Sequence, residues 1–152
     1  MEIADRAYKE LLGKFDVDGT GIIDSEHWGA FLRSRQITLG ALVLIPATRV
    51  ADFGDLTPNQ ASDLFGLVAT CQGLLRSSFQ ADRFNLVAAM MKDPFVHFHL
   101  IPRYEATRSF AQAVWSDDDW PALVSFSREP HPSGLNGAVL TKLRSAALSL
   151  PT

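Results

Sequence analysis

Two periodicities alternate along the 152 residues of the chain, and together they predict a fold of helices and strands. Apolar residues at every second position favour strands, whereas apolar residues three or four positions apart favour helices. This pattern predicts helices over 3–15, 57–79 and 136–148, and extended segments over 21–24, 27–33, 36–46, 82–91 and 95–101. We therefore predict one α+β domain over 1–152, with a mostly antiparallel sheet and one long helix packed on it. Residues 1–20 would form an N-terminal helix and turn, and residues 130–152 a linker and a C-terminal helix.

The long central helix has the clearest start signal. Thr57 is a good N-cap, Pro58 suits the first helical turn, and Gln60 completes a capping box. Cys71 falls on the apolar stripe of this helix, where a small core residue is expected.

The segment 95–101 alternates between two faces, since successive side chains of a strand point in opposite directions. One face is apolar throughout and should face the core: Val96, Phe98 and Leu100. The other face carries Phe95, His97, His99 and Ile101. Two imidazoles on one face can line one pocket, so His97 and His99 are the first candidates for chemistry.

Such a pair has several uses. It can bind a metal, shuttle protons, or act as a nucleophile with a helper, and it can also be purely structural on a half-buried strand. A metal site ranks low because no third ligand lies nearby in the sequence. Asn85 is a further candidate, since it stands alone in an apolar run and must either make a buried structural bond or serve a site.

Two acidic stretches imitate ion sites. Residues 16–27 resemble an EF-hand loop, with Asp16 and Asp18 in place, but the twelfth position is His27 where a bidentate Glu is needed. An Asp/Gly-rich turn is the simpler interpretation, and a calcium-responsive module is the third functional hypothesis. The run 117–119 contains three aspartates, which we interpret as a solvated loop.

Composition narrows the classes of function. The net charge of −3 and the sequence pI of about 5.7 argue against a general nucleic-acid binder, although a local basic rim could still bind phosphate. A single cysteine excludes an intrachain disulfide. The chain shows no signal peptide and no apolar run of spanning length, so we expect a cytoplasmic protein without membrane contact.

Residues 95–104, Phe-Val-His-Phe-His-Leu-Ile-Pro-Arg-Tyr, resemble the signature of the histidine triad (HIT) family of nucleotide hydrolases and transferases. The middle histidine of that signature matches His97 and the last matches His99, whereas Phe95 stands in place of the first. The glycine-containing segment that ends at Pro46 is similar to another family strand, and Arg49 stands where the family has a further histidine. The resemblance extends from about residue 21 to residue 104.

The resemblance implies a HIT-like fold, a homodimer, and a nucleotide substrate of the dinucleoside polyphosphate or nucleoside phosphoramidate type. It implies that His97 attacks the α-phosphorus to form a nucleotidyl-histidine, and that His99 assists. The expected substrate contacts, partly from the resemblance and partly from charge or packing, are Asn85, Arg103, Arg49 and Phe95. No cofactor or metal is required by this scheme. The alternative hypothesis is a catalytically degenerate nucleotide-binding or interaction protein.

Overall fold

The computed structural model describes residues 2–14, 17–130 and 132–151. Its main sheet has five antiparallel strands in the order β1-β2-β3-β5-β4. These strands are β1 (Gly21–Asp24), β2 (Trp28–Leu32), β3 (Leu42–Pro46), β4 (Arg83–Val87) and β5 (Phe98–Arg103). A separate hairpin follows, formed by β6 (Arg108–Phe110) and β7 (Ala113–Trp115). This confirms the predicted α+β class and the antiparallel sheet.

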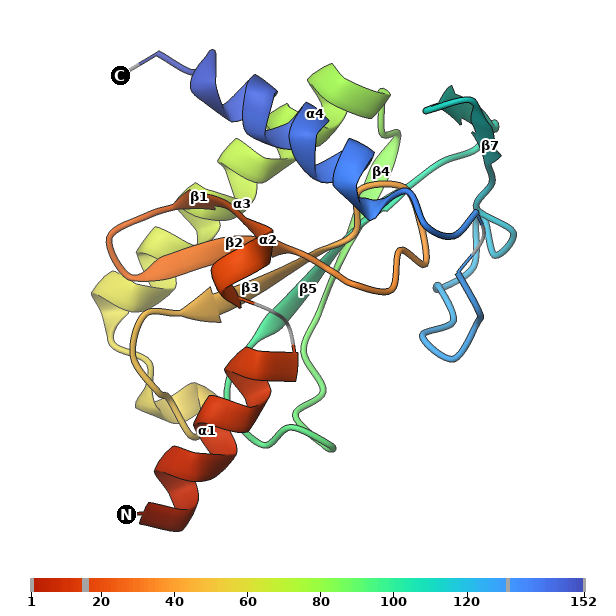
Figure 1. The fold of residues 1–152 in the computed structure, drawn as a ribbon. Helices are drawn as coiled ribbons and strands as arrows, with labels where there is room; N and C mark the ends of the chain where they lie inside the picture. Colours follow the sequence, from red (N-terminus) through yellow and green to blue (C-terminus); the bar gives the residue numbers. More distant parts are fainter. Residues whose placement is uncertain (1, 15–16, 131, 152) are drawn as a thin grey trace.

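The helices cover both faces of the sheet (Figure 1). They are α1 (Glu2–Lys14), the single turn α2 (Val17–Thr20), the short 3-10 helix η1 (Phe53–Asp55), α3 (Pro58–Phe79) and α4 (Asn136–Leu148). The main core lies between α3 and the sheet face that carries Leu42, Leu44 and Leu100. On the opposite face, Leu11 of α1 packs against Val43 and Ile45. No helix in the described ranges is long and apolar enough to cross a membrane.

The long helix begins as the sequence predicts. The Thr57 hydroxyl accepts a hydrogen bond from the Gln60 backbone N–H at 3.1 Å, and the Gln60 side chain accepts one from the Thr57 N–H at 2.9 Å. The apolar stripe of α3 is buried, and Cys71 is fully buried within it. Burial raises the pKa of the Cys71 thiol to about 12, so this side chain is an unreactive core residue.

The predicted strand over 36–46 is wrong in its first half. Residues 36–41 form a turn in which the Gln36 amide replaces missing strand partners: it donates to the carbonyls of Arg33 and Ala41 and accepts from the Gly40 N–H, each at 2.8 Å. Gly40 has a φ of +88°, a conformation that a glycine adopts without strain. The apolar composition of this segment therefore reflects burial and not strand pairing.

Two further boundaries differ from the prediction. Strand β5 begins at Phe98 and not at residue 95, because the Val96 N–H donates to the Val50 carbonyl at 2.8 Å, outside the ladder. Strand β4 ends at Val87, and Met90 takes a positive φ of 52° shortly afterwards. The alternation of faces nevertheless holds through the irregular start, since Val96 joins the α3 core and Phe95 joins the cluster under α1.

Candidate functional site

His97 and His99 lie together on the sheet face opposite α3. His99 is in β5, where it pairs with Val43 of β3 on one side and Val87 of β4 on the other. His97 directly precedes the strand, and the two ring centroids are 5.3 Å apart with an interplanar angle of 83°. The predicted juxtaposition of two imidazoles is therefore present.

The His97 ring is oriented by its own backbone. Its Nδ1 lies 2.7 Å from the carbonyl oxygen of Phe95, and the side chain is buried. A carbonyl oxygen can only accept, so Nδ1 carries the proton and donates it. In the neutral ring this leaves the lone pair on Nε2, which is the arrangement that a nucleophilic histidine needs.

The His99 ring is held from a different side. The Arg33 Nε donates to its Nδ1 at 3.2 Å. The His99 ring also meets the ring of Phe126 edge-on, with centroids 5.4 Å apart. Burial, together with the nearby positive charge of Arg33, lowers the pKa of His99 to about 3, so this imidazole is neutral at physiological pH.

Both histidines line a cavity of about 380 Å³. The wall brings together side chains from α1, the last residue of β4, the segments after β2 and β4, and the loop after β7: Lys14, Arg33, Arg35, Val87, Ala89, Met90, Met91, Lys92, Asp93 and Phe126. Four of these side chains are cations and one is a carboxylate. Lys14 closes one side by an ion pair with Asp93, at 2.5 Å between Nζ and Oδ2. The excess of positive charge over an apolar floor suits an anionic ligand with an apolar portion.

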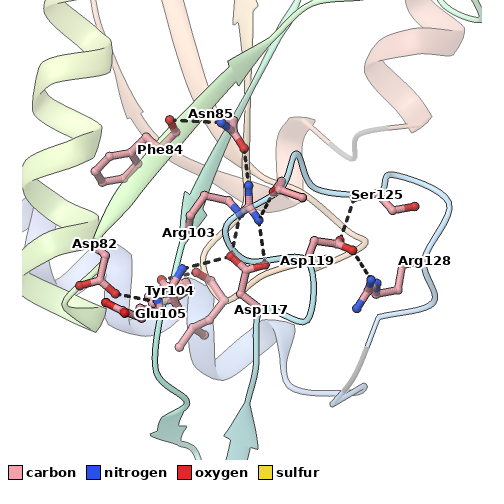
Figure 2. A network of polar contacts seen from close by, with 12 residues as sticks. Asp82, Phe84, Asn85, Arg103, Tyr104, Glu105, Asp117, Asp119, Ser125 and Arg128 are labelled. Atoms are coloured by element: carbon pink, nitrogen blue, oxygen red, sulfur yellow. Dashed lines mark hydrogen bonds and ion pairs between the residues drawn. The ribbon is translucent and has the colours of Figure 1, made fainter.

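Asn85 and Arg103 lie elsewhere. Arg103 Nη1 donates to Asn85 Oδ1 at 2.7 Å (Figure 2). The remaining donors of this guanidinium bind Asp117 and the Ala122 carbonyl. Neither residue is among the described residues that line the histidine cavity. The expected phosphate contact therefore finds no support in this arrangement, and Arg103 acts as an anchor within the protein.

The interpretation of the acidic run as a solvated loop is wrong for Asp117. Its side chain is 1% exposed, and its carboxylate accepts from the Arg103 Nε at 2.6 Å and from the Tyr104 N–H at 3.1 Å. Asp119 accepts from the Ser125 N–H at 2.9 Å and also pairs with Arg128 (Figure 2). These contacts fix the loop that brings Phe126 to the cavity. Asp118 remains largely exposed, as predicted.

Phe95 and Arg49 form a contact of their own. Phe95 is buried among Leu11, Val43 and Ile45, and its ring meets that of Tyr8 edge-on at 5.5 Å. The Arg49 guanidinium lies 5.8 Å from the Phe95 ring centroid, and Arg49 borders a second, polar hollow. Both residues lie outside the described lining of the histidine cavity, although the Phe95 backbone contacts His97.

The sequence reasoning missed Arg33 and Phe126. Arg33 is the last residue of the extended segment predicted over 27–33, and Phe126 lies in an irregular loop, so neither belongs to a motif. Both residues are distant from His99 in the sequence, so local sequence patterns do not predict their contacts with it. The position of Arg33 as a basic residue at the end of a predicted strand was the one indication in the sequence that it could belong to the site.

Most of the described part of the EF-hand-like stretch forms a helical turn and a strand and not a loop. Residues 17–20 form α2, residues 21–24 form β1, and Asp16 lies outside the described residues. Over the described ranges, the structure contains no group of three or more His, Cys, Asp or Glu side chains suited to hold a metal ion.

Comparisons with known proteins identify the family of this chain. The profile of the HIT domain matches residues 14–106. The Schizosaccharomyces pombe protein named bis(5'-nucleosyl)-tetraphosphatase [asymmetrical] is 32% identical over 109 residues, which are 68% of this chain and 60% of that protein. The Bacillus subtilis protein named "Protein hit" is 29% identical over 105 residues, which are 66% of this chain and 72% of that protein. The alignment thus spans only about 60% of the tetraphosphatase.

Solved structures show the same fold. A histidine triad protein from Marinobacter aquaeolei superposes with a TM-score of 0.69 at 20% identity, covering 91% of this chain and 96% of that one. A hypothetical histidine triad nucleotide-binding protein from Sulfolobus tokodaii gives a TM-score of 0.67 at 16% identity, covering 91% and 90%. The predicted HIT-like fold is therefore confirmed.

Proposed function

The chain belongs to the HIT family, and on that premise we propose that it is a nucleotide phosphohydrolase in which His97 is the nucleophile. The observation that carries the proposal is the bond from His97 Nδ1 to the Phe95 carbonyl, at 2.7 Å, which directs the lone pair of the neutral ring to Nε2. The proposed substrate class is a dinucleoside polyphosphate, in keeping with the name of the fission yeast relative.

The proposed reaction has two steps. His97 Nε2 attacks the α-phosphorus, a P–N bond forms, and the bond from that phosphorus to the bridging oxygen breaks, so that the nucleoside polyphosphate leaves with the electron pair. Water then attacks the phosphorus of the nucleotidyl-histidine and releases a proton to solvent, the P–N bond breaks with its electron pair returning to Nε2, and the mononucleotide is released. The two-step path divides one barrier into two smaller ones.

Charge stabilisation comes from the cavity wall. Arg33, Arg35 and Lys92 line the same cavity as the two histidines and can offset the negative charge of the phosphate chain. The proposal assigns phosphate contacts to these cations and not to Asn85 or Arg103, whose polar atoms bind each other.

The deciding experiment measures AMP release from diadenosine tetraphosphate by the wild type and by His97→Ala, with metal added in one arm and chelated in the other. We expect the wild type to release AMP in both arms and His97→Ala to fall to background. His27→Ala is the matched control, because it removes an imidazole that lies beside Glu26 and outside the cavity, and it should keep the wild-type rate. Equal release by the wild type and His97→Ala would exclude His97 as the nucleophile.

A binding protein without turnover is the alternative. The observation that favours it is Phe95, since an apolar side chain buried under α1 cannot donate or accept a hydrogen bond beside His97. If the wild type releases no AMP but AMP raises its thermal midpoint, the binding role takes the place of the enzymatic one.

Several expectations stay predictions. The resemblance predicts a homodimer, which sedimentation equilibrium would test. We also propose a nucleotide as the only ligand, without nucleic acid, membrane or cofactor, and a cytoplasmic location.

A further inference from the structure

Arg33 is fixed against His99 by three contacts. Its Nε donates to His99 Nδ1 at 3.2 Å, and its Nη1 donates to the Arg35 carbonyl at 3.0 Å. Its guanidinium carbon lies 5.1 Å from the centroid of the Phe126 ring, which also meets the His99 ring. The Arg33 side chain is therefore held in place by His99, by the Arg35 carbonyl and by the Phe126 ring.

The contact determines which nitrogen of His99 carries a proton. A guanidinium has five N–H donors and no acceptor, so His99 Nδ1 must present its lone pair. The proton of the neutral ring is then on Nε2. His97 has the opposite arrangement, because its Nδ1 donates to the Phe95 carbonyl. One ring thus presents a lone pair at Nε2 and its neighbour presents an N–H.

The same contact opposes a second proton on His99. Protonation at Nδ1 would break the bond from Arg33 and place two cations side by side in a buried site. Among the described residues, His97 and Lys14 also lower the pKa of His99, whereas Asp93 raises it. His99 therefore stays neutral over the physiological range.

A neutral Nε2–H can stabilise an oxygen by hydrogen bonding, but it cannot give its proton away without forming an imidazolate. The two substrate types that the family resemblance implies, phosphoanhydrides and phosphoramidates, differ in whether the leaving group needs a proton. A nucleoside polyphosphate leaves as a phosphate anion and needs no proton. An amine leaving from a phosphoramidate must take up a proton as the P–N bond breaks, since otherwise it departs as a strongly basic amide anion.

We propose that Arg33 is a positioning residue that makes His99 a hydrogen-bond donor and not a proton donor, and thereby makes the site selective for phosphoanhydrides over phosphoramidates. This inference rests on the proposed hydrolase function and specifies its substrate class. Arg33 would act through His99 in addition to its place among the cations of the wall.

The kinetic test compares kcat/KM for diadenosine tetraphosphate and adenosine phosphoramidate. The wild type should prefer the anhydride. In Arg33→Met, the ratio of kcat/KM for the anhydride to kcat/KM for the phosphoramidate should fall by ~10-fold or more. The reason is that a protonated His99 recovers part of the ~10²-fold or larger benefit of general acid catalysis. Arg35→Met is the matched control: it also removes a cation from the wall, but it lacks a bond to His99, so KM should rise with the ratio unchanged. Arg33→Lys, which keeps a cation that can donate a hydrogen bond, should restore most of the preference.

A second readout is independent of turnover. Nitrogen-15 NMR of the histidine rings should show His99 with an unprotonated Nδ1 at neutral pH in the wild type and in Arg35→Met, and a mixture of ring forms with a higher pKa in Arg33→Met. An unchanged substrate ratio in Arg33→Met, or a protonated His99 Nδ1 in the wild type, would overturn the proposal. If the wild type cleaves neither substrate, the hydrolase function and the selectivity both fail, while the NMR result alone still decides whether Arg33 positions His99.

Discussion

Arg103 and Asp117 form a buried, two-pronged ion pair that joins β5 to the loop after β7. The Nε–Oδ2 distance is 2.6 Å and the Nη2–Oδ1 distance is 3.1 Å, and the two side chains are 4% and 1% exposed. Arg103 lies on the same strand as His99, and the loop that begins at Asp117 carries Phe126. The pair therefore connects the strand of the histidine to the wall of its cavity.

Replacing one member of this pair should destabilise the fold strongly. Arg103→Met would leave the Asp117 carboxylate buried without its cation, and such a loss costs about 3–5 kcal/mol. Urea unfolding followed by circular dichroism measures the change. The matched control is Arg6→Gln, which breaks the exposed Arg6–Glu10 pair of α1 and should cost less than about 1 kcal/mol.

The double variant Arg103→Met/Asp117→Leu separates charge from packing. Because it removes the stranded carboxylate as well, it should recover much of the stability lost in the single variant. A double variant as unstable as the single one would show that the other bonds of Arg103, to Asn85 and the Ala122 carbonyl, dominate.

Gly40 and Gly73 should respond to alanine in opposite directions. A Cβ at Gly40 would lie 2.6 Å from Leu75 Cδ2, and the φ of +88° is strained for any side chain, so Gly40→Ala should cost at least about 1–3 kcal/mol. A Cβ at Gly73, inside α3, meets nothing within 4 Å, so Gly73→Ala should stabilise by about 1 kcal/mol. Thermal unfolding of both variants measures the contrast. Equal destabilisation by the two substitutions would contradict the turn geometry of 36–41.

Tyr104 ties that turn to the end of β5. Its hydroxyl donates to the Leu39 carbonyl at 2.5 Å, and burial raises the pKa of the phenol, so it stays protonated as the donor. Tyr104→Phe leaves the carbonyl without this partner, and we expect a loss of about 1–3 kcal/mol in the free energy of unfolding. A denaturant midpoint unchanged by Tyr104→Phe would indicate that another donor replaces the hydroxyl.

The sequence predicts the parts of this site that depend on neighbours in the chain. Alternation along one strand places His97 and His99 together, and the capping box at Thr57 locates the start of α3. It fails where partners are distant. The bond from Arg33 to His99 spans 66 positions, and nothing local distinguishes Asp117, which is buried, from Asp118, which is exposed.

Dependence on distant partners also explains why the sequence did not predict the contact between Asn85 and Arg103, the two residues expected to bind phosphate. Asn85 and Arg103 are polar groups in apolar strands, and such groups require partners. The sequence cannot show that they satisfy each other, because the pairing depends on the register between β4 and β5.

The free energy of unfolding should depend on pH in the way that a neutral, buried His99 predicts. The pKa of this imidazole is about 3 in the folded protein and near 6.5 when the chain is unfolded, so the unfolded state takes up its proton first as the pH falls. The contribution of the neutral His99 ring to the free energy of unfolding is therefore intact above about pH 6.5 and is lost progressively as the pH falls towards 3. His99→Gln removes this proton uptake but keeps a polar group in place. The described neighbours that act on the pKa of this ring, Arg33, His97, Lys14 and Asp93, are common to both proteins.

The wild type should thus lose stability relative to His99→Gln by up to ~1.4 kcal/mol per pH unit below pH 6. Urea unfolding at pH 7, 6, 5 and 4 measures the difference between the two proteins. A difference that stays constant from pH 7 to pH 4 would mean that the folded protein accepts the proton as readily as the unfolded chain. His99 could then serve as a general acid, and the preference for phosphoanhydrides would lose its physical basis.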